Sequence, residues 1–150
     1  MADRLYLDVS VLNRPFDDQS QVRIKLETEA FLAILERIEI GELAMVGSTV
    51  LDLENEANPF AERKERVESY LKLASHFVKV DEELKERAEA IATFGFKSFD
   101  ALHLACAEMA AETLLTVDDK VLKRAKDHRG ELDVRVLNPI DFVRTEIGEK

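Results

Sequence analysis

The chain has 150 residues, and its 31 Asp and Glu against 21 Lys and Arg give a formal net charge of −10. A hydrophobic fraction of 46% excludes a disordered chain, 5 Gly and 3 Pro exclude a collagen-like or low-complexity sequence, and a single Cys excludes a disulfide framework. A chain of this length buries roughly 68 to 70% of its unfolded surface, enough for one core. We therefore expect one soluble domain over residues 1–150.

The first residues lack a basic region followed by an apolar stretch, and no apolar run approaches the roughly 20 residues that span a bilayer. We therefore expect a cytoplasmic protein that does not bind membranes. The pI of about 4.8 argues against a protein that coats nucleic acid through clustered Lys and Arg. It does not exclude a nuclease, since carboxylates that hold cations also make a protein acidic.

Short apolar or β-branched runs alternate with longer helical patterns along the chain. In chain order, we expect a strand at 4–8, a helix at 23–40, a strand at 43–47, a short helix from near Ser48 to Pro59, a helix at 61–74, a strand at 76–80, helices at 81–94 and 98–111, a strand at 113–117, a helix at 118–127, a strand at 132–137 and a helix at 140–147.

This alternation predicts an α/β fold in which a central parallel sheet of four or five strands is flanked by helices in three layers. The strand at 76–80 contains His76 and Lys79 and is expected at the periphery, whereas the other strands are apolar enough to be buried. Because ligands of such sheets bind outside the carboxyl ends of the strands, we expect the chemistry there.

Two aspartates follow apolar strands. Asp8 comes directly after Leu5-Tyr6-Leu7, and Asp118 directly after the run at 114–117, so both carboxylates are expected at the carboxyl end of the sheet. The alternative for each is a helix cap or a turn residue.

Two further carboxylates are expected on helices. Glu54 shares a helical face with Val50 and Ala57, whereas Asp52 and Glu56 point elsewhere. A carboxylate on a buried face must be paired, protonated or metal-bound, unless it reaches past the face to solvent or to an Arg. Asp100 lies in the first turn of a helix that is apolar nearly all round, with Ser98 as the expected N-cap.

These carboxylates come from separate parts of the chain and can converge on one pocket, where they would repel without a counterion. Hard divalent cations take oxygen ligands, so Mg²⁺ or Mn²⁺ fits this set. Zn²⁺ would favour His or Cys, and the three His residues (His76, His103 and His128) show no ligand spacing.

The sequence resembles the PIN-domain ribonucleases, in particular the VapC-like toxins of toxin–antitoxin pairs. The resemblance covers nearly the whole chain and rests on blocks at 7–13, 48–54, 99–105 and 116–119, of which Asp100-Ala101-Leu102-His103-Leu104-Ala105 followed by Thr116-Val117-Asp118 is the most specific. It implies a PIN-like fold and a metal-dependent endoribonuclease that cleaves RNA.

By the same resemblance, the metal-binding and catalytic residues are Asp8, Glu54, Asp100 and Asp118, with Asp119 as a substitute or helper for Asp118. It further implies an RNA substrate and an antitoxin partner, and it allows a homodimer. The family commonly has a hydroxyl residue directly after its first Asp, where this chain has Val9, although Ser10 follows. This departure and the acidic charge favour one alternative, a catalytically weak PIN-like module that binds RNA or a protein.

The remaining candidates are weaker. Arg14 and Lys97 can contact RNA phosphate or simply be solvated. His103 lies one turn after Asp100 and can either touch the site or be a core residue. Cys106 is expected to be a small buried hydrophobe, because no His-Asp arrangement near it would make it a nucleophile.

Overall fold

A single parallel sheet forms the centre of the protein in the computed structural model, which describes residues 2–147. The strands lie in the order β3-β2-β1-β4-β5, and every neighbouring pair is parallel. They are β1 (Asp3–Leu7), β2 (Leu43–Ser48), β3 (His76–Val78), β4 (Thr113–Leu115) and β5 (Arg135–Leu137). The α/β fold predicted from the alternation of strand and helix patterns is confirmed.

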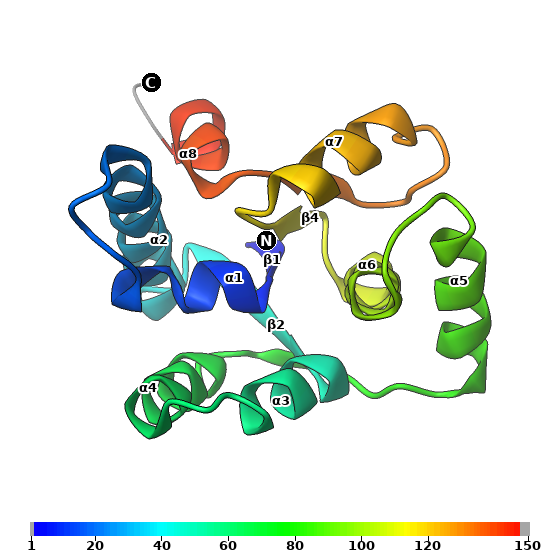
Figure 1. Ribbon diagram of the computed structural model, residues 1–150, viewed down its shortest axis with the longest axis horizontal. Coiled ribbons are helices and arrows are strands. Elements are labelled where there is room, and N and C mark those ends of the chain that lie inside the picture. Colours follow the sequence, from blue (N-terminus) through cyan, green and yellow to red (C-terminus); the bar gives the residue numbers. More distant parts are fainter. Residues whose placement is uncertain (1, 148–150) are drawn as a thin grey trace.

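Helices cover both faces of the sheet (Figure 1). Helix α2, with α8 packed on it, lies against one face, and α6, with α5 behind it, lies against the other. The helical elements are α1 (Val9–Leu12), η1 (Arg14–Phe16), α2 (Val22–Glu39), α3 (Thr49–Glu56), α4 (Ala61–Leu71), α5 (Glu82–Ala92), α6 (Ser98–Ala110), α7 (Asp119–Asp127), α8 (Pro139–Phe142) and the π-helical turn η2 (Val143–Ile147).

The central strand is β1, which carries the first aspartate of the site. Leu5, Tyr6 and Leu7 are all completely buried, as expected of a strand covered on both faces. The chain then turns directly into α1, so Asp8 lies at the carboxyl end of the middle of the sheet. Helix α2 ends before Gly41, whose φ of +84° lies in the left-handed region that favours glycine.

Two expectations about the strands are wrong. The strand expected at 132–137 spans only Arg135–Leu137, and it is an edge strand with an exposed Arg135. The strand expected at 113–117 ends at Leu115, and Thr116 and Val117 continue as a buried connection to Asp118. The sequence shows how apolar a strand is, but the order of strands in the sheet decides which one lies at an edge.

The start of α6 and two short helical elements also differ from expectation. The N-cap of α6 is Lys97 rather than Ser98, because the carbonyl oxygen of Lys97 accepts the first helical hydrogen bond, from Ala101 N at 2.9 Å. Asp100 nevertheless lies in the first turn. The short elements α1 and η1 were not expected, since each is too brief to show a hydrophobic period.

No helix within residues 2–147 combines the length and the apolar character needed to cross a membrane.

Candidate metal centre

Asp8 is held in place by hydroxyl groups on one side only. Its Oδ2 accepts hydrogen bonds from Ser10 Oγ and Thr116 Oγ1, both at 2.9 Å, while Oδ1 has no hydrogen bond among the residues that the structure describes. Although Asp8 occupies the N-cap position of α1, its side chain makes no capping bond. A structural role as a helix cap therefore does not explain this aspartate.

The hydroxyl donors Ser10 and Thr116 take the place of the hydroxyl residue that position 9 lacks. The resemblance places a hydroxyl residue directly after the first Asp, where this chain has Val9, but Ser10 and Thr116 both donate to the same oxygen of Asp8. Thr116 Oγ1 in addition accepts a hydrogen bond from Asp118 N at 3.1 Å, which links the loops after β1 and β4. Asp8 thus keeps two orienting donors without a hydroxyl at position 9.

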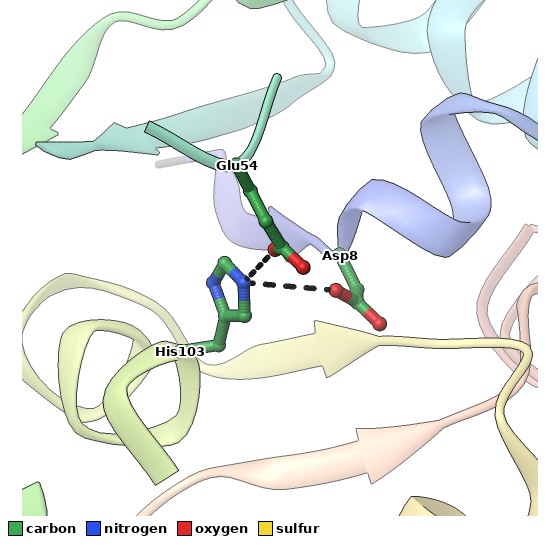
Figure 2. A group of neighbouring side chains, drawn as sticks. All are labelled: Asp8, Glu54 and His103. Atoms are coloured by element: carbon green, nitrogen blue, oxygen red, sulfur yellow. Dashed lines mark hydrogen bonds and ion pairs between the residues drawn. The ribbon is translucent and has the colours of Figure 1, made fainter. Parts of the chain in front are cut away.

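Glu54 lies on α3 at the border of that helix's buried face. Val50, Leu51 and Asn55 are buried, whereas the Glu54 side chain is 34% exposed. Ala57, expected on the same face, is exposed, so the buried face is narrower than the helical pattern predicts. Figure 2 shows the Glu54 side chain directed toward Asp8 and His103.

His103 joins these carboxylates, which is the first of the two alternatives that its position one turn after Asp100 left open, although the spacing of the histidines along the chain did not indicate a ligand. One ligand atom each from Asp8, Glu54 and His103 lie within 4.8 Å of one another. The ring Nε2 of His103 is 2.5 Å from Glu54 Oε1 and 3.9 Å from Asp8 Oδ1 (Figure 2). His103 reaches the site from α6, whose first turn also contains Asp100.

Asp100 and Asp118 lie outside this trio, but Asp100 is close enough for the charges of the other carboxylates to change its pKa. Burial raises the pKa of Asp100, and the nearby carboxylates of Asp8 and Asp118 raise it further. Asp118 is an exposed N-cap of α7, with Oδ1 accepting from Lys120 N at 2.9 Å and Val121 N at 3.3 Å. The capping role expected as an alternative for Asp118 is therefore real, and it uses only one of its oxygens.

Lys and Arg side chains do not compensate this carboxylate cluster, in which His103 contacts Glu54. Within residues 2–147, no Lys or Arg forms an ion pair with Asp8, Glu54, Asp100 or Asp118. Carboxylates gathered in this way repel one another and supply oxygen ligands. The donor set therefore fits a hard divalent cation such as Mg²⁺ or Mn²⁺.

Two other carboxylates, those of Glu27 and Asp119, are paired with arginines in a separate network. Glu27 is completely buried and accepts hydrogen bonds from Arg14 Nε at 2.8 Å, Arg23 Nε at 3.0 Å and Asn138 Nδ2 at 2.6 Å. Arg23 also donates to both oxygens of Asp119 at 2.7 Å. These hydrogen bonds lower the pKa of Asp119. Both oxygens of Asp119 are thus bound to Arg23 rather than directed at the other carboxylates of the candidate site.

The surroundings of Arg14, Lys97 and Cys106 show which of these weaker candidates is free to contact a substrate. Arg14 is bonded to Asp17 as well as to Glu27, so its guanidinium is committed to the fold rather than free for phosphate. Lys97 is exposed at the N-cap of α6, beside Asp100 in the chain. Burial raises the pKa of the Cys106 thiol to about 11, which agrees with a structural role.

We expect the repulsion in the cluster to be visible in stability measured without divalent ions. In the folded protein the pKa of Asp100 is above its unfolded value of about 4, so the folded state binds more protons between the two values. Stability from this group therefore falls as pH rises through that interval. Asp100→Asn should therefore gain stability relative to the native protein as pH rises through that interval.

Urea unfolding of both proteins in EDTA across this pH range measures the difference. A variant that is less stable than the native protein by the same amount at every pH would show that Asp100 is a structural residue of the helix start.

The geometry can be compared with known proteins. A family model described as "PIN domain" matches residues 5–127. The crystal structure of FitAcB from Neisseria gonorrhoeae is similar, with 22% identity, a TM-score of 0.56 and coverage of 90% of this chain and 97% of that one. The crystal structure of PAE2754 from Pyrobaculum aerophilum is similar at 15% identity and a TM-score of 0.51, with 95% of each chain covered. At these identities the likeness concerns the fold. No curated protein matches the chain.

Proposed function

This chain belongs to the PIN domain family, and we propose that it is a metal-dependent endoribonuclease that serves as the toxin of a toxin–antitoxin pair. The observation that carries the proposal is that Asp8, Glu54, Asp100 and Asp118 lie at the carboxyl end of the sheet without an ion pair to Lys or Arg within residues 2–147. Family membership supports nuclease chemistry, and the carboxylate cluster supports a divalent ion.

In this proposal the four carboxylates hold one or two Mg²⁺ or Mn²⁺ ions. A bound ion supplies Lewis-acid chemistry: it lowers the pKa of a water molecule and neutralises phosphate charge in an in-line displacement. The residues of the chain supply the geometry. Asp8 is oriented by Ser10 and Thr116, and Asp118 is fixed by the first turn of α7, so neither has to reorganise when substrate arrives.

The carboxylates do not serve as general bases in this proposal. An unperturbed carboxylate, with a pKa of about 4, is a weak base at pH 7. Burial raises the pKa of Asp100, and the nearby carboxylates raise it further by a repulsion that a bound cation would relieve. The same residues are therefore better suited to bind an ion than to accept a proton.

The alternative, a weakly active module, rested on Val9 and on the acidic charge. The hydrogen bonds from Ser10 and Thr116 to Asp8 support the active enzyme, because they orient this carboxylate without a hydroxyl at position 9. We therefore favour an active enzyme with single-stranded RNA as the substrate, an antitoxin as the protein partner and the cytoplasm as its location. A short neighbouring gene that encodes a DNA-binding segment would support the toxin assignment.

We expect the purified protein to cleave single-stranded RNA in Mg²⁺ or Mn²⁺ and to be inactive in EDTA, because the substrate phosphate otherwise faces uncompensated carboxylates. Gel analysis of an end-labelled RNA measures this, with activity restored by excess Mn²⁺ as the control for EDTA. Cleavage at an equal rate in EDTA would contradict the metal mechanism.

A further inference from the structure

A chain of buried hydrogen bonds leads from the core to Glu54. Both ring nitrogens of His103 are engaged, Nδ1 with the Tyr6 hydroxyl at 2.6 Å and Nε2 with Glu54 Oε1 at 2.5 Å. The Tyr6 hydroxyl also contacts Ser48 Oγ at 2.7 Å, and Ser48 caps α3, the helix that carries Glu54. Tyr6 and Ser48 are completely buried and His103 is 3% exposed.

The contact between His103 and Glu54 favours one of two roles for the histidine, a donor to Glu54 rather than a metal ligand. Ligands bind metal ions at about 2.0 to 2.2 Å, so two ligands of one ion lie roughly 3 Å or more apart. The contact between Nε2 and Oε1 is closer than that, and it fits a direct hydrogen bond from His103 to Glu54. The 3.9 Å to Asp8 Oδ1 is too long for a second one.

This bond does not depend on the charge of the imidazole. Nε2 carries its proton both in the imidazolium and in the neutral tautomer whose Nδ1 accepts from the Tyr6 hydroxyl. In the imidazolium the bond at Nδ1 simply reverses, with the ring donating to the Tyr6 oxygen. His103 thus donates to Glu54 in either form, and Tyr6 fixes the plane of the ring.

We propose that His103 is a positioning residue of the metal centre: supported by Tyr6, it holds one oxygen of Glu54 and leaves the other oxygen for a divalent ion. This inference rests on the proposed function, since it assumes the metal site. It assigns work to three residues that the acidic motif does not include, His103, Tyr6 and Ser48. Outer partners of this kind fix the orientation of a ligand and raise its basicity.

The role of His103 also affects which metal ion the site prefers. If the imidazole is occupied by Glu54, the remaining donors of the cluster are carboxylate oxygens, which suit Mg²⁺ and Mn²⁺. If the imidazole were itself a ligand, the site would favour ions such as Zn²⁺. The two roles therefore predict different effects when His103 is replaced by a side chain that keeps the donor but not the ring.

The test is Mn²⁺ binding to the free protein, measured by isothermal titration calorimetry for His103→Leu, His103→Gln and Tyr6→Phe. We expect His103→Leu to weaken Mn²⁺ affinity by about 10- to 100-fold and Tyr6→Phe to weaken it toward the lower end of that range, as is typical of outer-shell partners. The amide of His103→Gln can donate to Glu54, so this variant should recover most of the affinity.

Tyr70→Phe is the matched control. It deletes the same hydroxyl from a tyrosine that packs edge-on against Phe31, and within residues 2–147 that hydroxyl makes no hydrogen bond. Its Mn²⁺ affinity should equal that of the native protein.

Two results would overturn the proposal: native affinity in both His103→Leu and Tyr6→Phe, or a His103→Gln variant as weak as His103→Leu, which would make the imidazole a ligand. If His103→Leu fails to fold by circular dichroism, Tyr6→Phe alone decides, and unchanged affinity there overturns the proposal. A native protein that binds no Mn²⁺ would instead contradict the proposed function.

Discussion

Asp8→Asn is expected to lower the rate of RNA cleavage by more than about 100-fold, since loss of an outer partner of a metal ligand already costs 10- to 100-fold. The fold should survive the change. The partners of Asp8 Oδ2 are the hydroxyls of Ser10 and Thr116, and a hydroxyl can accept from an amide as readily as it donates to a carboxylate. Single-turnover cleavage at saturating Mg²⁺, together with a thermal melt, measures both effects.

Asp52 provides the control for position. It lies on α3 close to Glu54, and most of its side chain is exposed. Its partial burial and the charges of Glu56 and Glu68 raise its pKa, and the carboxylates of the site do not contribute. Asp52→Asn should therefore leave cleavage unchanged, whereas Glu54→Gln should reduce it strongly. If Asp52→Asn inactivates the protein and Glu54→Gln does not, the orientation of α3 is wrong.

Glu27→Gln is expected to reduce the free energy of unfolding by about 3 to 5 kcal/mol, the typical effect of breaking a buried ion pair. Glu27 is completely buried between Arg14, Arg23 and Asn138, which belong to three separate parts of the chain. A neutral side chain would leave the partly buried Arg14 with Asp17 as its one acidic partner among residues 2–147. Urea unfolding at neutral pH measures the loss.

Glu29→Gln is the matched control for this prediction, because Glu29 is exposed on the same helix. Equal stability of the two variants would show that the network around Glu27 contributes no more than a surface charge.

The sequence predicted the alternation of elements well because each strand and helix here has its own hydrophobic period. The pattern at 23–40 and Gly41 placed α2 within one residue at each end. The strand order was harder to predict, because it depends on which crossovers pack best. For that reason β5 looked as buried as β4 and is instead an edge strand.

The site was only partly predictable. Asp8 could be placed at a strand end from a short apolar run, and Asp100 in the first turn of a helix. The contribution of His103 could not, because its partners Tyr6 and Glu54 lie 97 and 49 residues away in the chain. The available signal was its position one turn after Asp100, which placed it near the site without indicating a partner.

Ser10 and Thr116 illustrate the same limit. Each stands two residues from an acidic residue of the motif, yet both converge on a single oxygen of Asp8. The parallel pairing of β1 with β4 brings the ends of these two strands together, and this pairing is a property of the folded sheet.

The most direct test of the account is the position of Mn²⁺ in crystals of the protein soaked with the ion, read from its anomalous scattering. We expect a peak at the carboxyl end of β1, in contact with Asp8 and with at least one of Glu54, Asp100 and Asp118, and no such peak in crystals of Asp8→Asn. A peak only at other acidic groups, or no peak at Mn²⁺ concentrations that support RNA cleavage, would contradict it.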